Sequence, residues 1–193
     1  MDFKESLKLQ LKSFEHLLEQ SKITPMVNEI TELLKEIKGI CYFTGVGKNM
    51  YVSSRVASTY DSLGIRSIFV DPVHTLHGSM GIFTENDCLF AISKSGNTSE
   101  LLFFLKALRG LGFDKIIGIT SNPSSELYRL SYIALVVDIY HEGDEFNIAP
   151  IASNMIFAAL LDSIAVEVSS RRGYSKSSFV RNHPGGELGK TKV

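Results

Sequence analysis

The sequence lacks a net charge that would direct it to a charged partner. Its 193 residues contain 20 lysines and arginines against 21 aspartates and glutamates, which gives a formal net charge of −1. Because no long-range field of one sign results, we expect neither nucleic acid nor an anionic membrane surface as a partner. Any anion that binds must be held by local groups.

The sequence has only two cysteines, and it shows no secretory signal. Cys41 and Cys88 both lie in apolar, strand-like runs and match neither a disulfide framework nor the spacing of a zinc site. We therefore predict two buried thiols. The N-terminus lacks the basic start and apolar run of a secretory signal, and no later segment is expected to span a bilayer. These absences favour a cytoplasmic location without membrane contact.

The patterns that are present predict an α/β fold. Apolar residues at helical spacing indicate two amphipathic helices within residues 1–38. Between the later strands lie helical stretches that end at Gly64 and Gly112, and a long apolar helix covers 149–170. Five short apolar runs are typical of strands buried on both faces: 40–43, 67–70, 88–92, 116–119 and 133–137. Their alternation with helices predicts a parallel sheet flanked by helices, in one domain over 1–193 with its α/β core and C-terminal helix in 39–193.

Ligands of such sheets bind at the carboxyl ends of the strands, and the first loop there is glycine-rich. Residues 44–49 read Thr-Gly-Val-Gly-Lys-Asn, so backbone N–H groups at Gly47 and the charge of Lys48 could hold an anion. A Walker motif is excluded because Tyr42 stands where the motif requires its first glycine. A dinucleotide fingerprint is excluded because Met50 stands where that motif requires its third glycine. An anion site and a plain strand-to-helix turn both remain open.

A second loop, residues 93–100, opens a helix after the third strand. Hydroxyl donors and free N–H groups at a helix start suit a phosphate. The spacing of Asn97 and Glu100 also fits a capping box, which is a purely structural alternative for Glu100. The loop after the fourth strand, 120–123, is interpreted as an ordinary helix cap followed by a first-turn proline. The phosphate hypothesis rests on hydroxyl side chains crowded around Gly96, namely Ser93, Ser95, Thr98 and Ser99.

Three histidines lie in loops that could reach the same edge: His74, His77 and His183. The pair His74 and His77 has a spacing that could bind a metal, but no third ligand can be identified, and we predict no metal. For each histidine taken alone, a structural hydrogen bond is the ordinary alternative.

The order of these motifs resembles the sugar isomerase (SIS) domain of arabinose 5-phosphate isomerases, in a short form without regulatory CBS domains. The matching segments run from the first strand to the end of the chain: Gly45-Val46-Gly47-Lys48, His77-Gly78-Ser79-Met80-Gly81, residues 93–100, Ala149-Pro150 and His183-Pro184-Gly185-Gly186-Glu187-Leu188-Gly189. The sequence departs from the family pattern at His74, Ser79, Lys94, Asn97 and Ile151.

The resemblance implies a five-stranded parallel sheet in a flavodoxin-like three-layer sandwich, and a dimer or tetramer whose subunits complete each other's sites. It also implies interconversion of D-arabinose 5-phosphate and D-ribulose 5-phosphate through an enediolate, without a cofactor, in the supply of Kdo for lipopolysaccharide or capsule. The substrate phosphate would be held by Gly47, Ser93, Ser95, Gly96 and Thr98.

The catalytic residues implied by the resemblance are Lys48, His77, Glu100 and His183. Glu100 is assigned as the base, with a pKa raised by shielding, and His183 as the acid or base that opens the ring. His77 would assist or position the substrate, and Lys48 would stabilise the enediolate. Alternatives are another SIS isomerase acting on a hexulose or heptulose phosphate, a non-catalytic phosphosugar-binding regulator, and a purely structural oligomer.

Overall fold

The computed structural model of the chain describes residues 1–185 and residue 190, and its centre is a parallel sheet. The neighbouring strands pair in the order β2-β1-β3-β4-β5. Because the strand order reverses between β1 and β3, a ligand is expected beyond the carboxyl ends of these two strands. All five predicted strands are confirmed: β1 (Cys41–Gly45), β2 (Ser67–Phe69), β3 (Cys88–Ile92), β4 (Ile116–Thr120) and β5 (Ile133–Val136).

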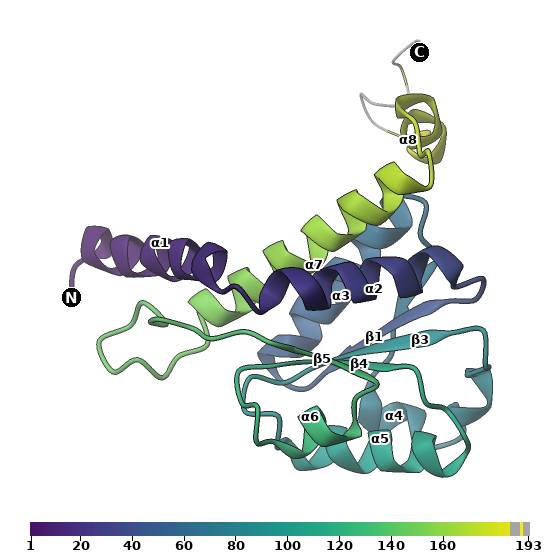
Figure 1. Ribbon diagram of the computed structural model, residues 1–193, viewed down its shortest axis with the longest axis horizontal. Coiled ribbons are helices and arrows are strands. Elements are labelled where there is room, and N and C mark those ends of the chain that lie inside the picture. Colours follow the sequence, from purple (N-terminus) through teal and green to yellow (C-terminus); the bar gives the residue numbers. More distant parts are fainter. Residues whose placement is uncertain (186–189, 191–193) are drawn as a thin grey trace.

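Helices cover both faces of the sheet, which confirms the three-layer sandwich (Figure 1). One face carries α2 (Ile23–Glu36), α3 (Lys48–Ser62) and α7 (Ala152–Arg171), and the other carries α4 (Pro72–Thr75), α5 (Ser99–Gly110) and α6 (Glu126–Leu130). A short 3₁₀ turn, Met80–Ile82, leads into β3. Gly64 and Gly112 follow the ends of α3 and α5 with φ of 78° and 85°, as glycines after a helix end commonly do.

The core on the α3 and α7 side of the sheet is aromatic. The rings of Phe43 and Phe90 stack with centroids 4.7 Å apart, and Tyr60 of α3 packs edge-on against Phe43. Each such side chain contributes about 1.5–3 kcal/mol by its burial. Cys41 and Cys88 lie in the same layer as buried thiols with Sγ atoms 3.5 Å apart. The hydrogen bond that the Cys88 thiol donates to Cys41, together with burial, raises the pKa of Cys88 well above its ordinary value. The prediction of buried thiols is confirmed.

The long apolar helix predicted near the C-terminus is α7, and it is a core helix. Its 20 residues meet the length and composition of a membrane span, so the expectation that no segment does so was wrong. More than half of that helix is nevertheless buried inside the fold, against α2 and α3. A helix that is apolar on most sides satisfies the same criteria when it is surrounded by protein.

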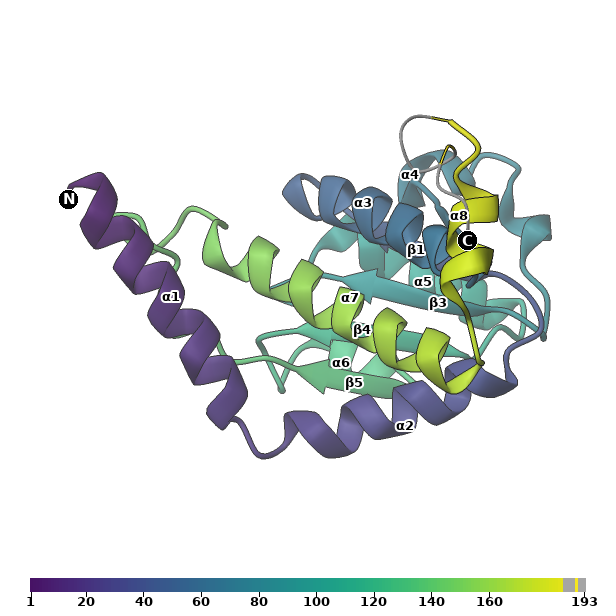
Figure 2. The same ribbon diagram turned by 90° about the horizontal axis from the view of Figure 1, so that it is seen from above.

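Helix α1 (Phe3–Glu19) extends beyond the carboxyl edge of the sheet (Figure 2). Ser13 is fully buried, and its hydroxyl and the backbone of His141 exchange two hydrogen bonds of 2.6 and 2.9 Å. The hydroxyl of Ser6 donates to the carbonyl of Gly143 at 2.6 Å. These polar contacts hold the helix together with Phe14 and Leu17, which pack against the core. The outward apolar stripe consists of side chains that are 57–87% exposed: Phe3, Leu7, Leu11 and Leu18.

Candidate functional site

The two loops singled out in the sequence lie side by side at the carboxyl edge of the sheet. Gly45, the last residue of β1, pairs in register with Ile92, the last residue of β3. The chain turns at Gly47, whose φ of 62° favours glycine, and enters α3 at Lys48. Lys48 is exposed and no acidic group pairs with it in the described part of the chain. Its charge is available to a ligand at this edge.

The serine loop after β3 is held in a fixed shape by its own hydroxyls. The hydroxyls of Ser93 and Thr98 lie 2.9 Å apart, and the N–H of Gly96 donates to the carbonyl and the hydroxyl of Ser93 at 3.0 and 3.1 Å. Gly96 has φ of 65°, and a Cβ there would collide with Ser125 and come within 2.7 Å of Thr120 Oγ1. Only glycine fits this position.

The N-cap residue of α5 makes no side-chain capping hydrogen bond, although the sequence offered a capping box as a structural alternative for Glu100. Thr98 is the N-cap residue, and it makes no capping hydrogen bond because its hydroxyl faces Ser93. The side chain of Asn97 instead accepts a hydrogen bond of 3.0 Å from the N–H of Glu126. The capping-box alternative was therefore wrong. First-turn N–H groups of α5 other than that of Glu100 remain open to an anion, and the helix dipole favours one there.

The loop after β4 supports the serine loop, a role that sequence reasoning missed. Thr120 Oγ1 donates to the carbonyl of Lys94 at 3.0 Å, and Asn122 Nδ2 donates to the carbonyl of Ser95 at 3.2 Å. The following helix begins only at Glu126 with Ser125 as its cap, so the predicted cap at 120–123 was also wrong. The sequence did contain a signal for this supporting role, because polar residues follow β4 directly, as they follow β3.

Glu100 is exposed in the first turn of α5. It accepts a hydrogen bond of 2.8 Å from the hydroxyl of Ser99. The pKa of Glu100 lies below its ordinary value because its own backbone N–H and the Ser99 hydroxyl donate to the carboxylate. The expectation of a raised pKa is not met in this single chain, since nothing shields the carboxylate. Glu100 is therefore ionised at neutral pH.

His77 lies on the segment that leaves the carboxyl edge after β2. Asp71 accepts a hydrogen bond of 2.7 Å from the N–H of His74 and thereby caps α4. Two residues after α4, the N–H of His77 donates to the carbonyl of His74 at 3.0 Å, and both histidine side chains are exposed. Among residues 1–185 and 190, no group of three or more possible metal ligands occurs. The prediction that no metal is needed remains a prediction.

His183 lies at the opposite edge of the sheet from the serine loop. It ends α8 (Lys176–Asn182), and Nδ1 lies 2.7 Å from the carbonyl of Phe179, whose ring stacks on the imidazole. Asn182 donates to the hydroxyl of Tyr174, which itself donates to the carbonyl of Ser62 at the end of α3. Figure 2 shows α8 and α1 at opposite ends of the molecule.

The expectation that the His183 loop reaches the carboxyl edge is therefore not met within one chain. The sequence motif continues from Gly186 to Gly189, and these residues lie outside the described part.

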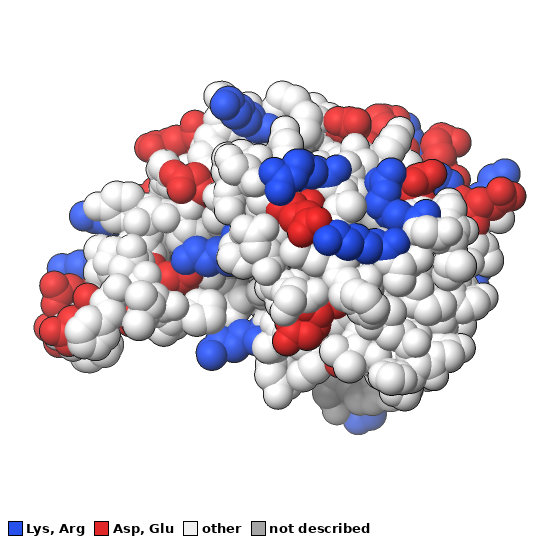
Figure 3. Space-filling model, turned by 90° about the horizontal axis from the view of Figure 1, so that it is seen from below, with Lys and Arg blue, Asp and Glu red and all other residues white. Residues whose placement is uncertain are grey.

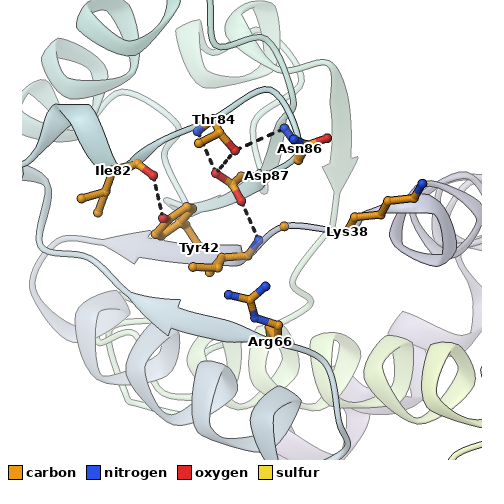
Figure 4. Close-up of a pocket in the computed structure, with 9 residues that line it drawn as sticks. Lys38, Tyr42, Arg66, Ile82, Thr84, Asn86 and Asp87 are labelled. Carbon is orange, nitrogen blue, oxygen red and sulfur yellow. Dashed lines mark hydrogen bonds between the residues drawn. The ribbon is translucent and has the colours of Figure 1, made fainter.

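A hollow of about 360 Å³ lies at the amino edge, separate from the site (Figure 4). Asp87 lines it as a buried carboxylate. Its oxygens accept hydrogen bonds from the N–H of Ile40 at 2.6 Å and from the N–H and hydroxyl of Thr84 at 2.7 Å each. The carboxylate is thus fully occupied in joining two loops, and we assign this hollow no chemistry.

Charges on the face formed by α4, α5 and α6 are mixed in sign (Figure 3). Lys106 pairs with Glu126 at 2.7 Å and Arg109 with Asp114 at 3.3 Å. This face offers no stripe of positive charge of the kind that follows a nucleic-acid backbone.

A three-layer α/β protein with a hydroxyl-rich loop and a helix N-terminus at the switch point of its sheet is the class that fold and site define. Residues 33–166 match the family model described as SIS domain. The chain belongs to the SIS domain family. This confirms the resemblance that the sequence motifs indicated.

Several similar curated proteins bear the name arabinose 5-phosphate isomerase. The chain is 35% identical over 159 residues to arabinose 5-phosphate isomerase KdsD of Pseudomonas aeruginosa, covering 82% of this chain and 48% of that protein. It is 33% identical to KdsD of Francisella tularensis, covering 98% and 58%. The chain thus spans about half the length of these curated relatives. The structure of E. coli CFT073 c3406 in complex with arabinose 5-phosphate superposes with a TM-score of 0.88 at 27% identity, covering 94% and 95%.

Proposed function

We propose that the protein is an aldose–ketose isomerase that interconverts D-arabinose 5-phosphate and D-ribulose 5-phosphate. The observation that carries the proposal is the uncapped N-terminus of α5 beside the paired hydroxyls of Ser93 and Thr98. Such a site suits a phosphate dianion. The names of the relatives and the arabinose 5-phosphate complex of a similar structure favour this phosphosugar over other phosphosugars.

The proposed phosphate site consists of the serine loop and the neighbouring glycine turn. Ser93, Ser95 and Thr98 would donate hydroxyl hydrogen bonds, Gly96 would let the backbone approach, and Gly47 would line the facing turn. With the phosphate at α5, the sugar would extend along the carboxyl edge toward Lys48. A phosphate held in this way orients C1 and C2 for proton transfer.

The proposed proton carrier is Glu100, which is ionised and follows Ser99 directly in the first turn of α5. It would remove the proton from C2 of the aldose and return it to C1, while Lys48 stabilises the negative charge of the enediolate. Covering of Glu100 by substrate or by a second subunit would remove water and raise its pKa toward neutrality. The exposed state of Glu100 in one chain is consistent with a site that is completed on assembly.

The proposed assembly is a dimer or tetramer in which His183 and His77 act across subunits. Support comes from the position of α8 at the far edge and from the outward apolar stripe of α1, since both features need a neighbour. His183 would open the sugar ring or move a hydroxyl proton, with His77 assisting. A cytoplasmic role in Kdo supply belongs to the same proposal and rests on the relatives alone.

The test is turnover of D-arabinose 5-phosphate by the purified protein without added metal or nucleotide. Ribose 5-phosphate and a hexulose 6-phosphate serve as parallel substrates. Conversion of the arabinose sugar alone is the expected result. Conversion of only the hexulose phosphate would reassign the substrate within the family. Binding without any turnover would identify a phosphosugar-binding regulator and overturn the proposal.

A further inference from the structure

Lys94 is the second residue of the serine loop (residues 93–100), and its side chain points away from the loop toward Glu142. Its ammonium forms an ion pair with Oε1 of Glu142, a residue 48 positions later in the chain. The lysine side chain is 39% exposed and the glutamate side chain is 0% exposed. The backbone carbonyl of Lys94 accepts hydrogen bonds from Thr120 and Ser121. The serine loop is thereby anchored on two sides.

Glu142 is a buried junction between the loop after β5 and the first turn of α7. Its Oε2 accepts hydrogen bonds of 2.9 Å from the N–H groups of Ile151 and Ser153. Its backbone N–H donates to Asn147, and its carbonyl accepts from Ala152. Burial alone would raise the pKa of Glu142, but the hydrogen bonds from Lys94 and Ser153 outweigh burial, and the pKa is lowered. The carboxylate is therefore charged and depends on Lys94 as its counter-ion.

The same turn of α7 also holds the other half of the site. Asn154, adjacent to Ser153, donates a hydrogen bond of 2.8 Å to Asn49, which is adjacent to Lys48. The first turn of α7 thus contacts the Lys48 turn directly and the serine loop through Glu142 and Lys94. Both halves of the site are fixed on one helix end.

We propose that Lys94 is a positioning residue, which through Glu142 fixes the serine loop against α7 and so sets the affinity for the phosphate of the substrate. The inference rests on the proposed function for the identity of that ligand. Only the carboxylate of this pair is buried, and removing its lysine partner leaves that carboxylate without a counter-charge. Here that charge would be a carboxylate behind the loop that receives a dianion, and it would both release the loop and repel the phosphate.

The experiment compares four variants of the full chain: Lys94→Met, Lys94→Arg, Lys94→Met combined with Glu142→Gln, and Lys106→Met. The last variant is a matched control, because Lys106 forms an exposed ion pair with Glu126 between α5 and α6. The measurements are KM and kcat for D-arabinose 5-phosphate, the dissociation constant of inorganic phosphate, and the thermal midpoint of each variant.

Lys94→Met is expected to raise KM and the phosphate dissociation constant about tenfold, with kcat changed less than about threefold. Lys94→Arg keeps the counter-charge and should remain within about threefold of the unmodified protein. The double variant removes the orphan carboxylate and should recover part of the loss, to about threefold above the unmodified protein. Lys106→Met should change none of these constants.

A fall in kcat and thermal midpoint with unchanged KM and phosphate affinity would assign Lys94 a merely structural role and overturn the proposal. If Lys94→Met does not fold, the double variant decides, and phosphate affinity equal to that of the unmodified protein overturns it. Failure of the proposed function is a separate result. If the unmodified protein shows no turnover, the isomerase proposal fails. If Lys94→Met then still binds phosphate more weakly than the unmodified protein does, the positioning role of Lys94 stands.

Discussion

The side-chain amide of Asn154 donates a hydrogen bond of 2.8 Å to Oδ1 of Asn49, and this contact joins the start of α7 to the turn that presents Lys48. Replacing Asn154 with alanine should cost about 1 kcal/mol of stability. It should also lower kcat more than it raises KM, because the freed turn carries the group assigned to the enediolate. Steady-state kinetics and thermal unfolding test this. Ser163→Ala is the control, since that hydroxyl bonds only within α7, to Ala159.

Substitution of Glu100 with glutamine tests the base directly. We expect kcat to fall by about a hundredfold or more, because the amide cannot accept the substrate proton. Thermal stability should change little, since the side chain is exposed and caps no helix. Glu126→Gln, in the first turn of α6, is the control and should retain activity. Near-normal turnover by Glu100→Gln would show that another residue moves the proton.

The pH profile should respond to the hydroxyl beside Glu100. In the single chain the pKa of Glu100 is lowered by its own N–H and by Ser99, so the ionised base is lost there only as pH falls through a value below the ordinary 4.5. Covering of Glu100 by a second subunit would move the acid limb to higher pH, but the Ser99 hydroxyl would still favour the charged form. Ser99→Ala removes a donor to the charged form and should raise this pKa. The acid limb of kcat/KM should therefore move to higher pH. A limb that stays in place would mean that it reports a different group.

Gly96 and Gly112 offer a matched pair of glycine substitutions. Both have positive φ, but a Cβ at Gly96 would strike Ser125 and Thr120, whereas nothing lies within 4 Å of a Cβ at Gly112. Gly112→Ala should cost about 1 kcal/mol of stability and leave phosphate binding intact. Gly96→Ala should also displace the serine loop and weaken phosphate binding about tenfold or more. Equal phosphate affinities in the two variants would contradict this assignment of the loop.

Mixing of two inactive variants tests whether subunits share a site. Glu100→Gln and His183→Ala should each be inactive alone, and a mixed dimer should contain one site with both native residues. Random reassembly gives half mixed dimers, each with one of two sites intact, so about a quarter of full activity should return. Activity after denaturation and refolding of the mixture is the measurement. No recovery would place both residues in the site of a single chain, whereas activity of His183→Ala alone would exclude His183 from the site.

The sheet could be predicted from the sequence because its strands are buried on both faces, as for Cys88–Ile92, where every residue is enclosed. An apolar run of this kind has few alternatives. The serine loop was predictable for a related reason, because hydroxyls crowded around Gly96 exceed what a turn requires.

Long-range partners could not be predicted from local spacing. Asn97 has the spacing of a cap for its own helix, yet its side chain bonds to Glu126, 29 residues later. Lys94 reads as a solvated loop residue until the fold brings Glu142 to it. The edge at which His183 lies depends on the direction of α7, which returns the chain to the amino ends of the strands. Such outcomes are set by tertiary packing, which one local pattern does not encode.

Helix α1 has its apolar stripe on the side away from the fold, while hydroxyl groups such as Ser13 bind it to the body. The stripe therefore adds little to the folding of one chain and becomes favourable only when another surface covers it. It follows that the protein should be sensitive to dilution. Below the concentration at which chains associate, the fold should persist while the stripe is exposed to solvent. Specific activity and the molecular mass measured by light scattering would then fall together.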